Sequence, residues 1–122
     1  MRHAEAAPGE PDALRPLTPD GRAQARELGE RLAKQRIDAV VCSPLLRARE
    51  TAELIARAAG IEAAPEEQLA PGADVTSLSA AVSGKGETVV VVGHQPDCSE
   101  MILVLTGEDR SFPPGACAEL EL

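Results

Sequence analysis

The sequence predicts an α/β protein in which a mostly parallel central sheet lies between helices, as a three-layer sandwich. Two short, largely apolar runs at 37–42 and 88–92 are typical of strands that are covered on both faces. Helical patterns alternate with these runs along the chain, which is the order expected for parallel strands joined by crossovers. A chain of 122 residues is long enough for one domain, so we expect 1–122 to form a single unit.

The first helix is expected over 19–36. Residues 7–16 hold three prolines and a glycine and are predicted to form a loop. Thr18 is a good helix cap and Pro19 suits the first helical position, and apolar residues then recur at helical spacing.

The second helix is expected over 44–59, where Ser43-Pro44 repeats the cap signal and Gly60 is a suitable terminator. Residues 60–73 are rich in Pro, Gly and Glu and are predicted to be a connector. A weaker helix follows over 74–83.

The C-terminal part is expected to hold a helix over 97–106, which Gly107 ends, and a loop over 111–115. Residues 116–122 alternate between small or apolar and acidic side chains, so we predict an edge strand there.

Composition excludes several classes of partner. The net charge of −8 disfavours binding to nucleic acid or to anionic lipid through bulk electrostatics. No apolar run approaches the roughly 20 residues that a membrane helix needs, and no signal-peptide pattern follows Arg2 and His3. The three cysteines are odd in number and widely spaced, which indicates a reducing compartment, so we expect a cytoplasmic protein.

Residues of possible chemical use follow the predicted strands. His94 comes directly after the 88–92 strand, and Arg47 lies in the first turn of the helix that follows the 37–42 strand. Ligand-binding groups of open α/β sheets project from the carboxyl ends of strands. Helix N-termini attract phosphate, and arginine adds a planar donor.

Each of these residues has an ordinary structural interpretation. His94 alone could bond a backbone carbonyl, Arg47 alone could pair with Glu50 or Glu53 in solvent, and Arg2-His3 alone could be chance. Together they have a clear use. A neutral imidazole is a good nucleophile for phosphorus, and fixed cations offset the charge of a phosphoryl group in transfer. No carboxylate cluster suggests a metal site, and no cofactor is implied.

The sequence resembles the histidine phosphatase superfamily, which has the phosphoglycerate mutase-like fold, and within it the small SixA-type branch. The motifs that carry the resemblance are Arg2-His3-Ala4-Glu5-Ala6, Arg15-Pro16-Leu17-Thr18-Pro19-Asp20-Gly21, Ser43-Pro44 with Arg47-Ala48 and Thr51-Ala52, and Val92-Gly93-His94-Gln95-Pro96. They occur in the family's order and spacing across nearly the whole chain.

The resemblance implies a role for each matching residue. His3 matches the nucleophile that becomes phosphorylated, and Arg2, Arg47 and His94 match the rest of the phosphate pocket. Arg15 matches an arginine of the short branch, and we expect it to contact substrate. Ser43 is interpreted as a helix cap.

The chain departs from the family pattern in three places. Ala4 stands where the family often has glycine. No acidic residue stands out as a general acid, and the candidates are Glu66, Glu67 and Asp74. In the family a central strand of several residues leads into the nucleophile, whereas only Met1 and Arg2 precede His3. We therefore expect an N-terminally truncated domain in which Met1 is an internal residue of a longer protein.

The leading hypothesis is a metal-independent phosphatase that works through a phosphohistidine at His3 and removes phosphate from protein phosphohistidine. One alternative is a small-molecule phosphomonoesterase of the same superfamily. A second is a non-catalytic module that binds phosphate or a phosphoprotein, and a third is a fragment that folds poorly. The partner would be a phosphorylated protein or a small phosphomonoester, and we expect a monomer.

Overall fold

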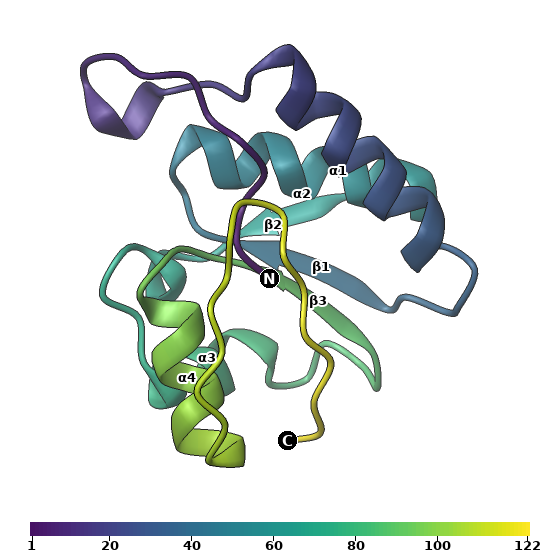
Figure 1. The fold of residues 1–122 in the computed structure, drawn as a ribbon. Coiled ribbons are helices and arrows are strands. Elements are labelled where there is room, and N and C mark those ends of the chain that lie inside the picture. Colours follow the sequence, from purple (N-terminus) through teal and green to yellow (C-terminus); the bar gives the residue numbers. More distant parts are fainter.

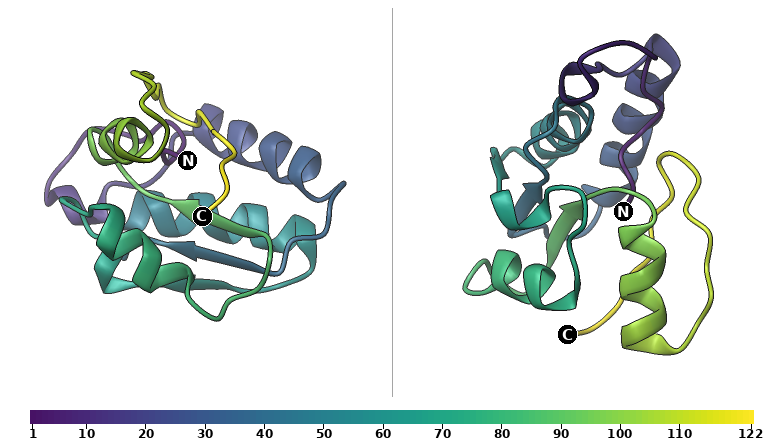
Figure 2. Two further views of the ribbon diagram at one scale, coloured as in Figure 1. Left: turned by 90° about the horizontal axis from the view of Figure 1, so that it is seen from below. Right: turned by 90° about the vertical axis from the view of Figure 1, so that its left-hand side faces the viewer.

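A parallel sheet of three strands, in the order β2-β1-β3, forms the centre of the computed structural model, which describes residues 1–122. The strands are β1 (Ala39–Cys42), β2 (Ala63–Pro65) and β3 (Val89–Val92). The helices are α1 (Pro19–Leu32), α2 (Leu46–Ala59), α3 (Val75–Val82) and α4 (Asp97–Thr106), with single 3-10 turns η1 (Asp12–Leu14) and η2 (Glu67–Leu69). Helices α1 and α2 lie on one side of the sheet and α3 and α4 on the other (Figures 1 and 2). The predicted three-layer α/β architecture is confirmed.

Helix α1 starts where the sequence predicts and ends four residues early. The Thr18 hydroxyl accepts a hydrogen bond from the Gly21 amide at 2.9 Å, and Pro19 occupies the first turn. The predicted extension to residue 36 is wrong. The amides of Lys34 and Gln35 bond carbonyls only three residues back, which tightens the last turn before the chain enters β1.

Helix α2 covers one face of the sheet. It begins at Leu46, two residues later than predicted, and Gly60 ends it with a left-handed φ of 75°. Its buried side chains pack against alternate strand residues in a core cluster. That cluster consists of Leu28, Val40, Cys42, Ala48, Ala52, Ile55, Ala56, Val90 and Val92.

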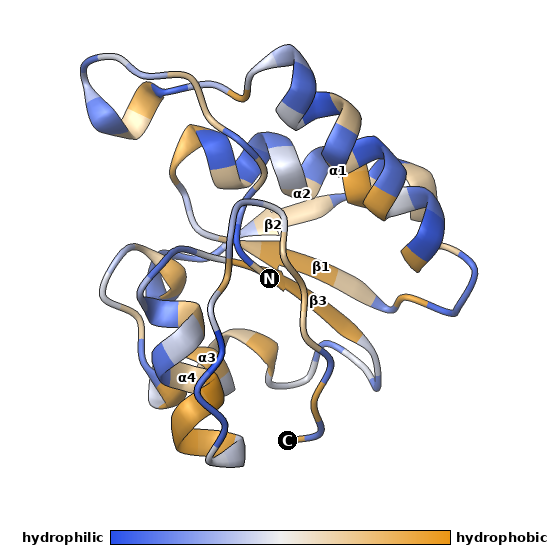
Figure 3. Ribbon diagram, in the orientation of Figure 1, coloured by the Kyte–Doolittle hydropathy of each residue, from blue (hydrophilic) through white to orange (hydrophobic).

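The opposite face of the sheet is also buried. Val41 packs with Leu69 and Ala81, and the half-buried Val89 and Val91 join them. Strands covered on both faces read as continuous apolar runs, which is why 88–92 was recognisable in the sequence. The strands are hydrophobic and the outer side of α1 is hydrophilic (Figure 3).

Two expectations about strands are corrected. Residues 60–73 were predicted to be a connector, yet Ala63–Pro65 forms β2 and pairs with Val40–Cys42 in parallel register. Alanine and proline have little strand propensity, so the pairing comes from tertiary context. The edge strand predicted over 116–122 is absent. Only Ala116, at the start of that segment, is bonded to the N-terminal residues, and no strand lies beside the residues that follow. An apolar groove of about 360 Å³ is lined by these residues on one side and by β3 on the other.

Residues 1–3 lie beside the free edge of β3. The Met1 ammonium donates to the Val91 carbonyl at 2.6 Å, and the Gly93 amide donates to the Met1 carbonyl at 2.8 Å. On the other side of this segment, the Arg2 amide donates to the Ala116 carbonyl at 3.1 Å. The N-terminal residues are therefore held between β3 and the C-terminal segment, as Figure 1 shows. None of the helices is both long and apolar enough to cross a membrane.

Gly21 provides a test of how α1 positions the N-terminal motif. A Cβ at this position would clash with the backbone carbonyl oxygen of Glu5, which cannot move as a flexible side chain would. We predict that Gly21→Ala lowers the free energy of unfolding by about 2 kcal/mol, because overpacking exceeds the roughly 1 kcal/mol that alanine gains in helix propensity. Denaturant unfolding measures the change.

The matched control is Ala23→Gly at an exposed position of the same helix. It should cost about 1 kcal/mol through propensity alone. If Gly21→Ala were more stable than wild type, the close approach of α1 to the Glu5 backbone would not restrict residue 21 to glycine.

Candidate functional site

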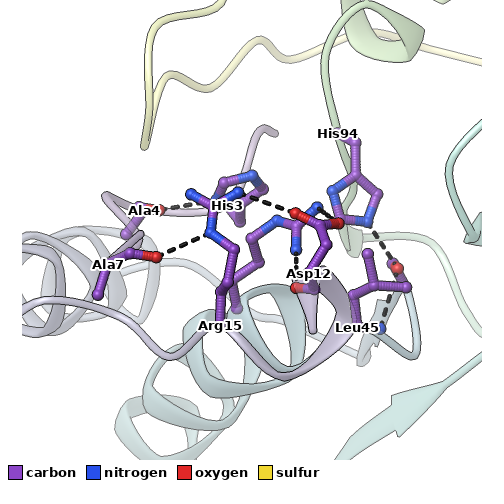
Figure 4. Close-up of polar contacts among 9 residues, drawn as sticks. His3, Ala4, Ala7, Asp12, Arg15, Leu45 and His94 are labelled. Atoms are coloured by element: carbon purple, nitrogen blue, oxygen red, sulfur yellow. Dashed lines mark hydrogen bonds and ion pairs between the residues drawn. The ribbon is translucent and has the colours of Figure 1, made fainter. Parts of the chain in front are cut away.

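The predicted site residues come together at the carboxyl ends of β1 and β3. His3 follows the segment that pairs with the end of β3, His94 follows β3 itself, and Arg47 lies in the first turn of α2 after β1. Arg2 and Arg15 lie close enough to bear electrostatically on His3. Figure 4 shows His3, Arg15 and His94 facing a common space. The structure therefore brings together all five residues that the sequence singled out.

The backbone around His3 is bonded on both sides. The His3 amide donates to the Gly93 carbonyl at 3.1 Å, and the His3 carbonyl accepts from the Gly115 amide at 2.9 Å. The next amide, that of Ala4, donates to the hydroxyl of Thr51 at 3.1 Å, and Thr51 is fully buried in α2. Three separate parts of the chain thus fix the position of His3.

The His3 ring is buried, and one of its two nitrogens is hydrogen-bonded to the backbone. Nδ1 lies 2.7 Å from the carbonyl oxygen of Ala4, which can only accept, so Nδ1 carries the proton and Nε2 keeps its lone pair. Burial lowers the pKa of His3 to about 4, and the neighbouring arginines add to that effect. His3 is therefore a neutral imidazole with a free nitrogen at neutral pH.

His94 is bonded to a side chain and not to a backbone carbonyl. Its Nε2 lies 2.7 Å from the Ser43 hydroxyl, and its Nδ1 is buried without a partner. The Ser43 oxygen also accepts from the Leu45 amide, and when its hydroxyl donates to Nε2 the ring proton of His94 lies on Nδ1, which is then an unused donor. Burial again lowers the pKa, to about 4. The ring centroids of His3 and His94 are 5.3 Å apart.

Arg47 is a buried cation and does not pair with the glutamates beside it in α2. Its side chain is 9% exposed, and it bonds the Asp12 carboxylate at 3.2 Å and the Asp12 carbonyl at 2.9 Å. Glu50 instead pairs with Arg22 and accepts from the Leu17 amide. The Leu17 bond fixes the segment that leads from the N-terminal loop into α1.

The two other arginines hold the loops around the site. Arg15 Nε donates to the Ala7 carbonyl at 2.8 Å, while its Nη1 bonds the Asp12 carboxylate at 3.0 Å. Arg2 donates through Nη1 to the Phe112 carbonyl at 3.1 Å, and its Nε is buried without a partner. Arg2 Nε and, in that tautomer, His94 Nδ1 are thus buried donors without a partner.

Three residues of the site were missed or misread from the sequence. Asp12 lay in a segment read as a plain loop, although an acid three residues before an arginine was a visible signal for an ion pair. Ser43 was interpreted as a helix cap, but the N-cap of α2 is Leu45 and the Ser43 hydroxyl bonds His94. Thr51 supports Ala4 from a distance of 47 residues, and no local pattern reveals such a contact.

Two of the three candidate general acids have other structural contacts, and the third is exposed. Glu66 lies 3.4 Å from Lys85, Asp74 caps α3 through the Ser77 amide, and Glu67 is exposed in η2. The carboxylate that does lie among the site cations is that of Asp12. No group of three His, Cys, Asp or Glu side chains is placed to hold a metal ion.

The sequence model of one protein family, the histidine phosphatase superfamily (branch 1), matches residues 1–71, which is more than half of the chain. The chain belongs to the histidine phosphatase superfamily. The matched residues include His3, Arg15 and Arg47, and His94 lies outside them in the part of the chain that follows.

Curated relatives of this superfamily member include a phosphohistidine phosphatase. The chain is 34% identical to the phosphohistidine phosphatase SixA of Escherichia coli over 105 residues, 79% of this chain and 65% of the relative. It is 37% identical to an uncharacterized protein of Picosynechococcus over 99 residues, 73% of this chain and 58% of the relative. The chain thus matches less than two thirds of the length of either relative.

Solved structures of this superfamily resemble the fold closely. A structure of the protein histidine phosphatase SixA complexed with tungstate has a TM-score of 0.81 at 32% identity, covering 93% of this chain and 80% of that one. A putative phosphohistidine phosphatase SixA from Agrobacterium tumefaciens has a TM-score of 0.74 at 32% identity, covering 89% of this chain and 75% of that one. The phosphoglycerate mutase-like fold expected from the sequence is thereby confirmed.

The lowered pKa values predict how stability depends on pH. The pKa of His3 and of His94 is about 4 in the folded protein and about 6.5 in the unfolded chain, so the unfolded chain binds protons first as pH falls. The stability that depends on neutral histidines is complete above pH 6.5 and is lost between 6.5 and 4. Each histidine contributes up to about 3 kcal/mol.

Denaturant unfolding at several pH values measures this loss. Three aspartates also have lowered pKa values, but from an ordinary value of 3.8, so most of their contribution is lost below this window. The double variant His3→Asn, His94→Gln should show a much flatter profile between pH 6.5 and 4. A wild-type free energy of unfolding that is constant over this range would contradict burial of two neutral histidines.

Proposed function

We propose that this protein is a phosphatase that transfers a phosphoryl group to His3 and then to water. The observation that carries the proposal is the state of His3: a buried, neutral imidazole whose Nδ1 is bonded to Ala4 and whose Nε2 is free. A nucleophile needs an available lone pair held in a fixed position, and both conditions are met.

The surrounding cations account for binding of the phosphoryl group. Arg2, Arg15 and Arg47 supply planar donors, and the unpartnered Nδ1 of His94 adds another. A phosphoryl group in transfer spreads negative charge over its oxygens, and donors already fixed in place stabilise that charge without reorganising. Positive charge supplied by three arginines is the basis for proposing a mechanism that is independent of metal.

The reaction has two balanced steps. In the first, His3 Nε2 attacks phosphorus, the bond from phosphorus to the leaving group breaks, and the leaving atom takes a proton from solvent. In the second, water attacks the phosphorus on His3 and the bond from phosphorus to Nε2 breaks. Orthophosphate leaves with one proton of the water, and the other returns to solvent. His3 regains its lone pair on Nε2. Its Nδ1 keeps its proton throughout and donates it to the carbonyl oxygen of Ala4.

Protein phosphohistidine is the substrate class that we propose. The relatives described as phosphohistidine phosphatases support it, since they share 32–34% identity with this chain. The chemistry also fits a site without a dedicated general acid, because a leaving imidazole is protonated far more readily than an alkoxide. The Asp12 side chain, which bonds two of the site arginines, is 62% exposed, so this part of the site faces solvent.

The test is release of phosphate from a histidine-phosphorylated carrier protein in EDTA, with wild type, His3→Ala and Glu10→Gln compared. Glu10 is an exposed residue that makes no ion pair. We expect wild type and Glu10→Gln to release phosphate at similar rates, and His3→Ala to be slower by about 10³-fold or more. Thermal unfolding of each variant checks that it is folded.

Three results would redirect the proposal. Release by His3→Ala at the wild-type rate would rule out His3 as nucleophile. Release from small phosphomonoesters but not from phosphohistidine would indicate the small-molecule phosphatase. Binding of phosphate without turnover of either substrate, in a folded protein, would indicate a binding module.

A further inference from the structure

The carboxylate of Asp12 forms ion pairs with two arginines of the proposed phosphate site. Asp12 Oδ1 lies 3.0 Å from Arg15 Nη1, and Asp12 Oδ2 lies 3.2 Å from Arg47 Nη2. The carbonyl oxygen of the same residue accepts from Arg47 Nη1 at 2.9 Å. Figure 4 shows Asp12 between Arg15 and His94.

The two partners in this contact differ in how firmly they are held. The Arg47 side chain is buried at the start of α2 with 9% exposure, whereas the Asp12 side chain is 62% exposed on a single 3-10 turn. The carboxylate can therefore leave into solvent, while the guanidinium stays in place. Asp12 bonds both Nη atoms of Arg47, so a phosphoryl group that approaches the same edge of the guanidinium competes with it for these donors.

The side chain of Asp12 has no other evident use. The 3-10 turn closes through main-chain bonds, from the Leu14 amide to Pro11 and from the Arg15 amide to Asp12, without the carboxylate. Its side chain is neither buried nor used as a helix cap. Its charge is maintained, because Arg15 and then Arg47 lower the pKa of the carboxyl group.

A carboxylate that bridges two guanidinium groups resembles two oxygens of a phosphoryl group in charge and in hydrogen-bonding geometry. We propose that Asp12 is a built-in competitor for the phosphoryl group, which must displace its carboxylate from Arg15 and Arg47 in order to bind. This inference rests on the proposed function, since it assumes that these arginines bind phosphate.

The proposal predicts a gain of affinity when the competitor is removed. Asp12→Asn keeps the size of the side chain and the hydrogen bond from Arg47 to the backbone carbonyl of residue 12, but it removes the negative charge. We expect orthophosphate to bind about 3- to 30-fold more tightly, because two partly exposed ion pairs no longer need to be broken and the charge repulsion is gone. Glu10→Gln removes one negative charge from the same loop and serves as the matched control.

Titration calorimetry with orthophosphate at pH 7.5 measures the dissociation constants of wild type, Asp12→Asn, Glu10→Gln and Arg47→Gln. Tighter binding by Asp12→Asn, with Glu10→Gln unchanged, would support the proposal. In turnover assays the same variant should show a lower KM for phosphohistidine protein, with kcat within about twofold of wild type.

Equal or weaker binding by Asp12→Asn, with Arg47→Gln unable to bind, would overturn the proposal and leave the phosphatase function standing. Asp12 would then be a residue that positions the arginines. Orthophosphate binding that persists unchanged in Arg47→Gln, or that is absent from both wild type and Asp12→Asn, would overturn the arginine site itself and the proposed function with it.

Discussion

The position of His3 depends on hydrogen bonds between parts of the chain that lie far apart in the sequence. Its amide bonds the end of β3, its carbonyl bonds Gly115, and the following amide bonds Thr51 inside α2. Buried backbone groups are costly to leave unpaired, so the partners of these groups are constrained strongly. The two core clusters that flank the sheet fix β3 and α2, and through them they fix the proposed nucleophile.

The electrostatics of the site oppose those of the whole chain. The protein carries a net charge of −8, yet three arginines lie around two neutral histidines. Burial keeps the histidines uncharged, and the nearby cations favour the same state. Asp12 offsets part of this positive charge in the unliganded protein. In the proposed mechanism, such a site exchanges one anion for another, and the carboxylate gives the arginines a partner when phosphate is absent.

Much of the fold was predictable from the sequence, and so was the meeting of His3, Arg47 and His94 at the carboxyl ends of the strands, because these signals are local or lie in motifs. The apolar run at 88–92, the Thr18 cap and the glycines after α2 and α4 each act through neighbouring residues. The failures share a cause, which is dependence on distant partners. Residues 63–65 form a strand only because β1 lies beside them, and 116–122 does not form one because no strand does. Asp12, Ser43 and Thr51 acquire their contacts from residues 35 to 51 positions away.

The most direct test of the account is to trap the phosphorylated protein. The chain is mixed with phosphohistidine carrier protein, quenched in alkali within milliseconds to seconds, and analysed by intact and peptide mass spectrometry. The account predicts one added phosphoryl group, located on His3, stable in alkali and lost in acid. Phosphate released without any phosphorylated protein, or a phosphoryl group on His94 or on a serine, would contradict the central claim that His3 is the nucleophile.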